Sequence, residues 1–464
     1  MFDAFADALD ALAIPAGADV ALAYSGGIDS SVLLDLAALY ARERGLTLHA
    51  FHIHHGLSPN ADTWLAHCAQ ICAARGIAFE ACRIDLTGAS NSGSGVEEAA
   101  RLHRYAALGA LCRKHGAKWL LTAHHQDDQA ETVLLQLLRG AGVAGLSGMD
   151  AANIAPTLLG SADLTMARPL LHIARSAIEH YAQAHAVAYV EDESNTDTRY
   201  ARNAVRLQVM PLLAALFPGF QQRFTRTAGH AQSAQRLLIE LGAQDLKQCL
   251  QGDCLDIVEV KKLDADRIDN LLRYWFGVRG MRMPSSAWLS EMRTQLLEAK
   301  ADAQLCVTHP DCHIRRHRDR IYLTPRRDRD VSEIAAQTFV WAGQQSIAFA
   351  DFEGTLHFDP AGSDEAGIDA QWLREQSCWI RYRSGGERLK LAPNRPTKSV
   401  KYHYQVMDIP AWERPYLPIV GFGAANTLLF ASGIGMDCAH QQLHGERVRL
   451  RWEPAAPGDD KNYK

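Results

Sequence analysis

The sequence predicts an α/β fold in which a parallel sheet is covered by helices on both faces, and three observations support this. Within residues 1–215, short apolar runs alternate with segments of helical periodicity. Glycines and charged residues gather where an apolar run ends and a helical segment begins. The chain has 47% hydrophobic and 22% charged residues, as in an ordinary soluble globular protein. Repeated strand–helix units of this kind form parallel sheets, because each helix carries the chain back across one face.

Four strand–helix units account for most of this first region. The strand-like runs lie at 19–25, 46–56, 77–85 and 117–125, and the helical segments that follow them lie at 30–45, 62–76, 96–116 and 129–140. An amphipathic helix is expected before them, within residues 1–17. In such a sheet, ligands bind beyond the carboxyl ends of the strands, so functional residues are expected directly after the strand-like runs.

The pattern changes after residue 215, and two further domains are expected. Residues 216–325 show long helical stretches and one strand-like pair at 312–325, which predicts a mostly helical middle domain. Residues 326–335 are polar and charged, as in a linker. Residues 336–464 mix short strand-like runs with Gly and Pro, which is typical of a small α/β domain.

The composition excludes several classes of protein. No apolar run is long enough to span a membrane, and the N-terminal stretch lacks the basic cluster of a secretory signal. The ten cysteines include no CxxC pair, so we expect reduced thiols in a cytoplasmic protein. The net charge of −5 gives no general attraction to nucleic acid, so any such site must depend on a local basic cluster. The oligomeric state stays open, with a homodimer as one option.

The first strand-like run ends in the string SGGIDSS, residues 25–31. Gly26 and Gly27 remove Cβ atoms that would block the approach of a ligand to the backbone. The following helix, expected to begin near Ser30, directs free N–H groups and its positive dipole end into the turn. The alternative is a tight turn with a serine N-cap, because the string is neither GxxxxGK[ST] nor GxGxxG. As a binding site, the turn is a cradle for an anion such as phosphate.

A second cluster, AHHQDDQAE, lies at the end of the fourth strand-like run. Asp128 and Glu131 are three residues apart and share one face of the expected helix. Acidic residues also favour helix N-termini for structural reasons alone. As a functional site, the carboxylates offer hard oxygen ligands for Mg²⁺, with phosphates completing the shell. A transition-metal site with His124 and His125 is a further alternative, although the histidines of 46–56 add no recognised ligand spacing.

Arginines follow in two helical strings. Arg101 lies in EEAARLHRYAAL, and Arg202 and Arg206 share one helical face in EDESNTDTRYARNAVR. Taken singly, each is most simply a solvated surface charge. Beside a phosphate cradle, they can neutralise charge that develops at a transferring phosphoryl group.

The string SGGIDSS, between a first strand and a helix, resembles the PP-loop of the N-type ATP pyrophosphatases. The series HIHHGLSPNAD, EEAARLHRYAAL, TAHHQDDQAETVLLQLLRGAG, GLSGM, RPLL and EDESNTDTRYARNAVR narrows the resemblance to the tRNA(Ile)-lysidine synthetase family. The string IRYRSGGERLKLAPNRPTKSVKYHYQVMDIPAWERPYLPIV looks like the C-terminal domain of that family. The resemblance is strong over 20–215 and good over about 379–435. Residues 220–300 resemble the family's middle domain only in position and character.

The resemblance implies a Rossmann-like PP-loop ATPase fold and a specific reaction. ATP adenylates the C2 carbonyl oxygen of the wobble cytidine of a tRNA(Ile) with a CAU anticodon, and pyrophosphate is released. The ε-amine of free L-lysine then attacks C2 and displaces AMP, which leaves lysidine. That amine has a reference pKa of about 10.4, so it must lose a proton to attack. ATP and Mg²⁺ are the implied cofactors, and no protein partner is implied.

The resemblance also assigns site residues by motif match. The ATP-binding residues are Ser25, Gly26, Gly27, Ile28, Asp29 and Ser30. The catalytic residues are Asp29, Asp128, Glu131, Arg101 and Arg202. Mg²⁺ is assigned to Asp29 or Asp128, and the choice of lysine-binding carboxylate and of base is left open.

Two basic stretches are candidates for tRNA binding. Seven Lys/Arg residues and one acid, Glu387, lie from Arg381 to Lys401, and seven arginines and two aspartates lie from Arg315 to Arg329. Such clusters bind phosphate even in an acidic protein, because charges are screened over about 10 Å. The alternative is a pair of solubilising faces. The expected tRNA-binding residues are Arg381, Arg383, Arg388, Lys390, Lys398 and Lys401.

Three rival functions fit parts of the sequence. A tRNA thiolase of the same superfamily typically needs a persulfide-bearing cysteine or a CxxC-ligated cluster, and the sequence has no CxxC. An ammonia-using amide synthetase usually has a glutaminase partner domain, for which this chain has no obvious counterpart. A non-catalytic, ATP-gated tRNA-binding protein would keep the loop and the basic tail but form no AMP.

Overall fold

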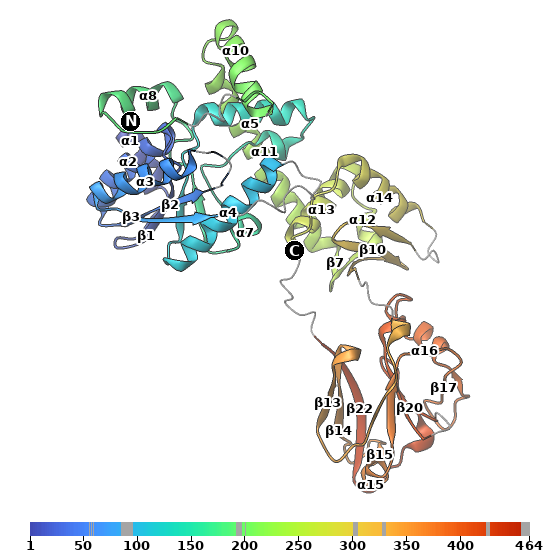
Figure 1. Cartoon of the computed structure of the whole chain (residues 1–464). Coiled ribbons are helices and arrows are strands. Elements are labelled where there is room, and N and C mark those ends of the chain that lie inside the picture. The colour runs from blue at the N-terminus through green and yellow to red at the C-terminus, as the bar shows by residue number, and fades with distance from the viewer. Residues whose placement is uncertain are drawn as a thin grey trace. The chain divides into compact units, whose positions relative to one another are not determined.

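The computed structural model describes residues 1–54, 56, 58, 60–84, 96–191, 197–199, 201–299, 305–326, 331–423 and 427–455, without the side chains of 96–99 and 332. Parts of the strings at 52–62 and 191–206 therefore lie outside the described residues. The chain forms two compact units, Met1–Glu240 and Leu241–Lys464, and the long helix α11 (Phe220–Cys249) runs through the boundary between them (Figure 1). In the described part of the chain, no helix combines the length and apolar character needed to cross a bilayer.

The first unit is built on a six-stranded sheet with strand order β3-β2-β1-β4-β6-β5. Its strands are β1 (Asp19–Ala23), β2 (Thr47–His54), β3 (Ala78–Arg83), β4 (Trp119–Leu121), β5 (Ala152–Ile154) and β6 (Thr165–Ala167). All neighbouring pairs are parallel except β5 with β6. The predicted α/β class is confirmed, and β1 to β4 are the four predicted strands.

Helices cover both faces of this sheet (Figure 1). The helices of this unit are α1 (Phe2–Asp10), α2 (Ile28–Arg44), α3 (Ala61–Arg75), α4 (Val96–Lys114), α5 (Gln126–Leu138), α6 (Val143–Leu146), α7 (Pro156–Leu159), α8 (Arg175–Ala184), α9 (Ala201–Ala204), the π-helix η3 (Val205–Val209) and α10 (Met210–Leu216). Val20 and Leu22 of β1 pack in the core with α1, α2, α3 and α8, whereas Ala21 packs in the core with α4 and α7. Successive side chains of a strand point to opposite faces, so apolar residues in an uninterrupted run fill both layers.

The strand order positions the site. The chain leaves β1 toward β2 on one side and later returns to add β4 on the other side. The loops after β1 and β4 therefore diverge at a switch point, where α/β sheets bind ligands. These two loops carry SGGIDSS and HHQDDQAE.

The second unit begins in α11 and continues through a middle part. This part contains β7 (Leu250–Gln251), β8 (Cys254–Asp256), α12 (Ile257–Val260), α13 (Ala265–Val278), α14 (Ser286–Glu298), β9 (Cys306–Thr308), β10 (Cys312–His317) and β11 (Arg320–Pro325). Its helices pack on a five-stranded antiparallel sheet through a core that includes Trp275 and Phe276. The predicted strand pair is β10–β11, and the sheet around it is larger than the sequence indicated.

The C-terminal part is rich in strands, and its described residues include two short α-helices. The elements are η4 (Val331–Glu333), β12 (Gln337–Phe339), β13 (Ser346–Phe349), η5 (Ala350–Phe352), β14 (Gly354–Pro360), β15 (Ile368–Asp369), α15 (Ala370–Arg374), β16 (Cys378–Arg381), β17 (Arg388–Leu389), β18 (Lys398–Ser399), α16 (Val400–Val406), η6 (Arg414–Tyr416), β19 (Ile419–Phe422), β20 (Thr427–Ala431), β21 (Gly435–Met436), η7 (Cys438–His440) and β22 (Arg447–Pro454). The domain limits 1–215, 216–325 and 336–464 stay a prediction.

Candidate active site

The loop after β1 has the geometry of an anion cradle. Helix α2 begins at Ile28, two residues earlier than expected, and Gly27 is its N-cap. Asp29 and Ser30 therefore lie in the first turn of α2, where N–H groups have no acceptor within the helix. The Ser30 hydroxyl donates to the Gly27 carbonyl at 3.0 Å and lies 3.0 Å from the Ser25 hydroxyl. The predicted ATP-binding residues are thus brought together around one helix N-terminus.

The two glycines of the loop serve different purposes. Gly26 has φ of +87°, and a Cβ there would lie 2.8 Å from the Cys68 sulfur and 3.1 Å from the Val190 side chain. The protein itself therefore requires a glycine at this position, in addition to the ligand approach that the sequence predicts. A Cβ on Gly27 would meet the Ser25 hydroxyl at an ordinary 3.6 Å. The space beside Gly27 is therefore free for close approach of a ligand.

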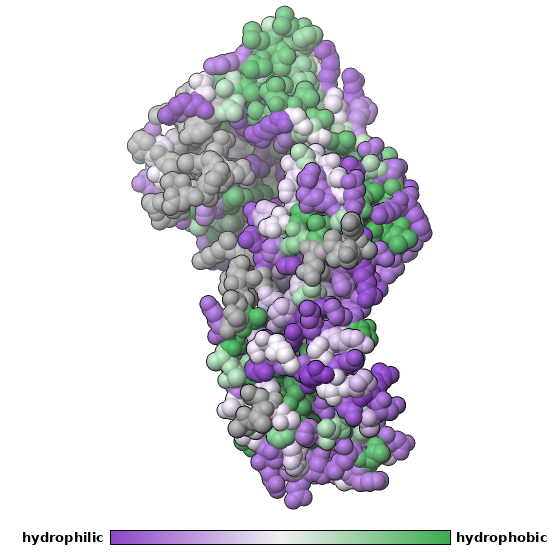
Figure 2. Space-filling view, turned by 90° about the vertical axis from the view of Figure 1, so that its right-hand side faces the viewer, coloured by the Kyte–Doolittle hydropathy of each residue, from purple (hydrophilic) through white to green (hydrophobic). Residues whose placement is uncertain are grey.

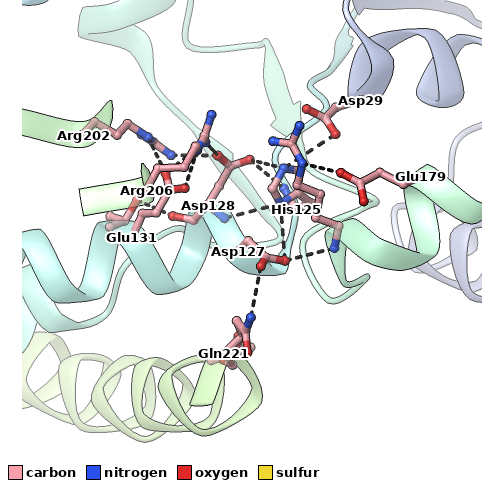
Figure 3. A network of polar contacts seen from close by, with 12 residues as sticks. Asp29, His125, Asp127, Asp128, Glu131, Glu179, Arg202, Arg206 and Gln221 are labelled. Atoms are coloured by element: carbon pink, nitrogen blue, oxygen red, sulfur yellow. Dashed lines mark hydrogen bonds and ion pairs between the residues drawn. The ribbon is translucent and has the colours of Figure 1, made fainter. Parts of the chain in front are cut away.

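The loop after β4 places carboxylates beside this cradle (Figure 3). His125 is the N-cap of α5 and forms a capping box with Asp128, whose carboxylate accepts the His125 N–H at 3.1 Å. Asp128 and Glu131 lie on one face of α5, as predicted, and Glu131 is only 1% exposed. Burying two acids side by side is unfavourable unless cations neutralise them.

Arg202 and Arg206 supply this neutralisation. Arg202 donates to Glu131 at 2.9 Å and to Asp128 at 3.0 Å. Arg206 donates to the two Glu131 oxygens at 2.6 and 3.0 Å and to Asp128 at 2.9 Å. Arg206 lies in the π-helix η3, which ends two residues before Pro211, a residue that has no N–H to donate. Together the two arginines give every oxygen of Glu131 and one oxygen of Asp128 a charged donor.

Asp29 faces this network from the opposite side (Figure 3). Its Oδ1 atom lies 3.7 Å from His125 Nε2, and both atoms are buried without a hydrogen-bond partner among the described residues. His125 Nε2 is also 3.3 Å from an Asp128 oxygen. His125 thus lies between two carboxylates and caps helix α5. The alternative that His124 and His125 bind a transition metal did not predict this capping role.

The electrostatics of the site separate its titratable groups. Burial would raise the pKa of Asp128, but the charges of His125, Arg202, His124 and Arg206 outweigh it and hold the pKa well below the usual range. Burial, helped by neighbouring arginines, lowers the pKa of His124 to about 3. Burial also opposes protonation of His125, yet the negative charges of the nearby Asp29, Asp128 and Asp127 raise its pKa. At neutral pH the site therefore holds an ionised Asp128 beside a neutral His124.

The remaining predicted catalytic residue, Arg101, lies at the edge of this network. Its guanidinium stacks over the Tyr105 ring at 5.1 Å, and its charge contributes to the low pKa of His124. Asp127, to which the sequence assigned no role, accepts the Arg175 N–H at 2.9 Å and the Gln221 amide at 3.3 Å. Asp127 thus joins α5 to the first residue of α8 and to α11. An acidic residue in the first turn of a helix indicates a capping role in the sequence, but the sequence does not show which other helices it contacts.

The predicted tRNA-binding residues fall into two groups. Arg381 and Arg383 are partly buried and pair with Glu387 at 2.9 and 3.7 Å. Glu387 also accepts the backbone N–H groups of Ser384 and Gly385. The other four have no ion pair among the described residues and are Arg388, Lys390, Lys398 and Lys401. The second group offers four charges without an ion pair, whereas the first group keeps one net positive charge because two arginines share one carboxylate.

The donor set suits Mg²⁺ at Asp29 better than at Asp128. The unpartnered, buried Asp29 Oδ1 is a free hard ligand, whereas Asp128 already accepts from two arginines and a backbone N–H. No group of three or more His, Cys, Asp or Glu side chains in the described ranges is arranged to hold a metal ion. Mg²⁺ commonly binds through one or two carboxylates plus substrate phosphates, and this arrangement fits that mode.

Comparisons with known proteins agree with this geometry. Residues 4–213 match the PP-loop domain, 255–322 the TilS substrate binding domain and 378–452 the TilS substrate C-terminal domain. The tRNA(Ile)-lysidine synthase of Burkholderia pseudomallei (strain K96243) is 41% identical, over 98% of this chain and 96% of the relative. That of Ralstonia nicotianae (strain ATCC BAA-1114 / GMI1000) is 41% identical over 95% and 94%, and that of Azoarcus sp. (strain BH72) 37% over 97% and 95%. With such identity along almost its entire length, this chain belongs to the tRNA(Ile)-lysidine synthase family.

Proposed function

We propose that this chain ligates free L-lysine to C2 of the wobble cytidine of a tRNA(Ile) with a CAU anticodon, while ATP is cleaved to AMP and pyrophosphate. The observation that carries the proposal is the meeting of two loops from the adjacent strands β1 and β4. The phosphate cradle and the Asp128–Glu131 pair face each other there across His125. The family relationship supports the choice of RNA and amino acid.

The loop residues bind and orient ATP. The first-turn N–H groups of α2 and the hydroxyl of Ser25 donate to phosphate oxygens, and the helix dipole favours their negative charge. Held in this way, the α-phosphate is exposed to the C2 oxygen of the cytidine. Mg²⁺ bound through Asp29 would neutralise charge on the departing pyrophosphate.

The two arginines and the two carboxylates form an exchangeable set of charges. In the structure every carboxylate oxygen of Asp128 and Glu131 already has a donor. The lysine ammonium can bind these carboxylates only if an arginine gives up part of its contacts. An arginine released in this way is free to contact the negatively charged phosphoryl centre, which is where catalysis needs it. Asp128 or Glu131 then orients the lysine and takes up its proton.

Sulfur transfer is the rival chemistry, and the cysteines near the site argue against it. Burial raises the pKa of Cys68 to about 12 and that of Cys72 to about 11. Both thiols are fully buried on α3 and stay protonated at neutral pH. A buried thiol of this kind is a poor sulfur carrier.

One assay tests the proposal. The protein is incubated with labelled lysine, ATP–Mg²⁺ and a tRNA(Ile) transcript, and we expect label in RNA together with AMP and pyrophosphate. Asp128→Asn is expected to abolish AMP formation while tRNA affinity stays nearly unchanged. The exposed Asp163→Asn serves as a control that keeps full activity. Formation of ADP and orthophosphate, or sulfur-dependent modification, would contradict the proposed reaction.

A further inference from the structure

One segment of the first unit is basic without containing a single acid. Residues 198–239 include no Asp or Glu, and their arginines are Arg199, Arg202, Arg206, Arg223, Arg226 and Arg236. Residues 132–149, the end of α5 and the loop after it, also lack acids and contain Arg139. Such a distribution is unusual in a chain with net charge −5. Acids outside these segments pair with Arg199, Arg202 and Arg206, so the local positive field comes from the remaining arginines.

The two acid-free segments meet in space. Leu134 and Leu135 of the first segment and Leu213 and Phe224 of the second pack around a small core of Ala130, Val205, Met210 and Phe220. The outer sides of the same elements expose large apolar residues. Their exposed fractions are Leu137 57%, Leu138 69%, Leu212 64%, Leu216 72% and Phe217 54%. In Figure 2 the upper end of the first unit, where Figure 1 labels α10, is largely hydrophobic.

Basic side chains lie on the same elements as this apolar area. Arg139 follows α5, and Arg223 and Arg226 lie in the first two turns of α11. All three are exposed, and none has an ion pair with an acid among the described residues. Arg223 donates to the Pro218 carbonyl, which holds it beside the turn that leads from α10 into α11. We define Leu137, Leu138, Arg139, Leu212, Leu216, Phe217, Arg223 and Arg226 as the apolar–basic surface.

We propose that the apolar–basic surface binds the anticodon arm of the tRNA, with its arginines on backbone phosphates and its apolar side chains against unstacked bases of the loop. This inference rests on the proposed function, because a base in an anticodon loop must be splayed out to react. Its neighbours then lose stacking partners and expose apolar faces that protein side chains can cover. The surface follows Arg206 directly in the chain, so bound RNA would lie next to the Asp128–Glu131 pair.

Charge decides between RNA and a second copy of this chain as the occupant. An apolar surface of this kind can also mark a contact between protein subunits. A self-interface would bring the unpaired arginines of two copies together with no acid in these segments to neutralise them. Like charges in a contact cost free energy, whereas RNA phosphates neutralise the same arginines.

Two double variants test this inference. Arg223→Ser with Arg226→Ser is expected to weaken binding of tRNA(Ile), and of an isolated anticodon stem–loop, about tenfold, and to lower the slope of log K against log[salt] by about 1.5. Leu212→Ser with Leu216→Ser is expected to weaken binding with an unchanged slope, because it removes base contacts and no charge. Circular dichroism confirms that each variant folds.

The matched control removes two charges at the end of the sheet where the parallel strands begin, away from the loops after β1 and β4. Arg42 near the end of α2 and Lys118 before β4 are exposed, and Arg42→Ser with Lys118→Ser is expected to leave the stem–loop affinity unchanged. Wild-type affinity of both surface variants for the stem–loop overturns the inference. The inference is also overturned if the Leu212→Ser, Leu216→Ser variant loses self-association in a sedimentation experiment but keeps wild-type affinity for RNA. Lysine incorporation by the wild-type enzyme is measured in a separate assay. If no lysine is incorporated, the proposed function is contradicted, but the RNA contact is not.

Discussion

Residues 202–239 of the first unit and residues 381–401 of the second both hold two arginines on carboxylates, and both leave other basic residues without an ion pair in the described part of the chain. The acids come from different places. Glu387 lies within six residues of both of its arginines, in the loop that directly follows β16. Asp128 and Glu131 lie 71 to 78 residues before Arg202 and Arg206, on another helix. The comparison teaches that a count of basic residues overstates the positive charge available for RNA, because some of these residues are paired with acids. An acid close in the sequence, such as Glu387, can be found without a structure, whereas remote acids such as Asp128 and Glu131 cannot.

The largest expected difference between the two regions is in stability. Arg206→Ala leaves Glu131, which is 1% exposed, without one of its two cations, and should lower the free energy of unfolding of the first unit by about 3–5 kcal/mol. Arg381→Ala leaves Glu387 bonded to two backbone N–H groups and should cost its own unit only about 1 kcal/mol. Urea unfolding followed by circular dichroism measures both. The two arginine side chains are similarly exposed, at 26% and 21%, so equal losses would mean that the origin of the acid is unimportant.

The next expected effect is on RNA binding by the second region. Arg388→Ala with Lys398→Ala removes two charges that have no ion pair among the described residues, and should weaken tRNA binding about tenfold and flatten its salt dependence. Arg381→Ala removes a charge that Glu387 already neutralises and should leave the salt slope unchanged. Filter binding at several salt concentrations measures both slopes. Equal slopes for wild type and the double variant would show that this stretch is a solvated face.

The smallest expected effect is a pH dependence caused by the first region. Burial and the field of nearby arginines lower the pKa of His124 to about 3, so the folded protein keeps it neutral while the unfolded chain protonates it near pH 6.5. The contribution to stability is therefore lost as pH falls below 6.5, by about 1 kcal/mol between pH 6.5 and 5.5. His124→Asn should remove this part of the slope in melts across that range. An unchanged slope would mean that His124 is protonated in the folded state.

Much of the fold was accessible to prediction because its signals are local. Apolar runs at 19–25 and 117–125 alternate with helical periodicity, and this identified β1 and β4 and the loops after them. The five-stranded sheet of the middle part was largely missed, because strands as short as β7 and β8 carry too few residues for a pattern. The start of α2 was misplaced by two residues, since a glycine N-cap gives no side-chain signal.

By itself, the sequence determined which chemical groups this protein brings to its reaction: a glycine turn ahead of a helix, two acids spaced to share a face, and arginines downstream. Only the tertiary structure decided which of these groups are committed to one another. Arg202 and Arg206 hold Asp128 and Glu131, His125 stands between Asp29 and Asp128, and Arg381 and Arg383 are held by Glu387. The physical reason is that a turn or a helix face forms from neighbouring residues. An ion pair, in contrast, depends on the distance between two side chains, which the packing of remote elements sets.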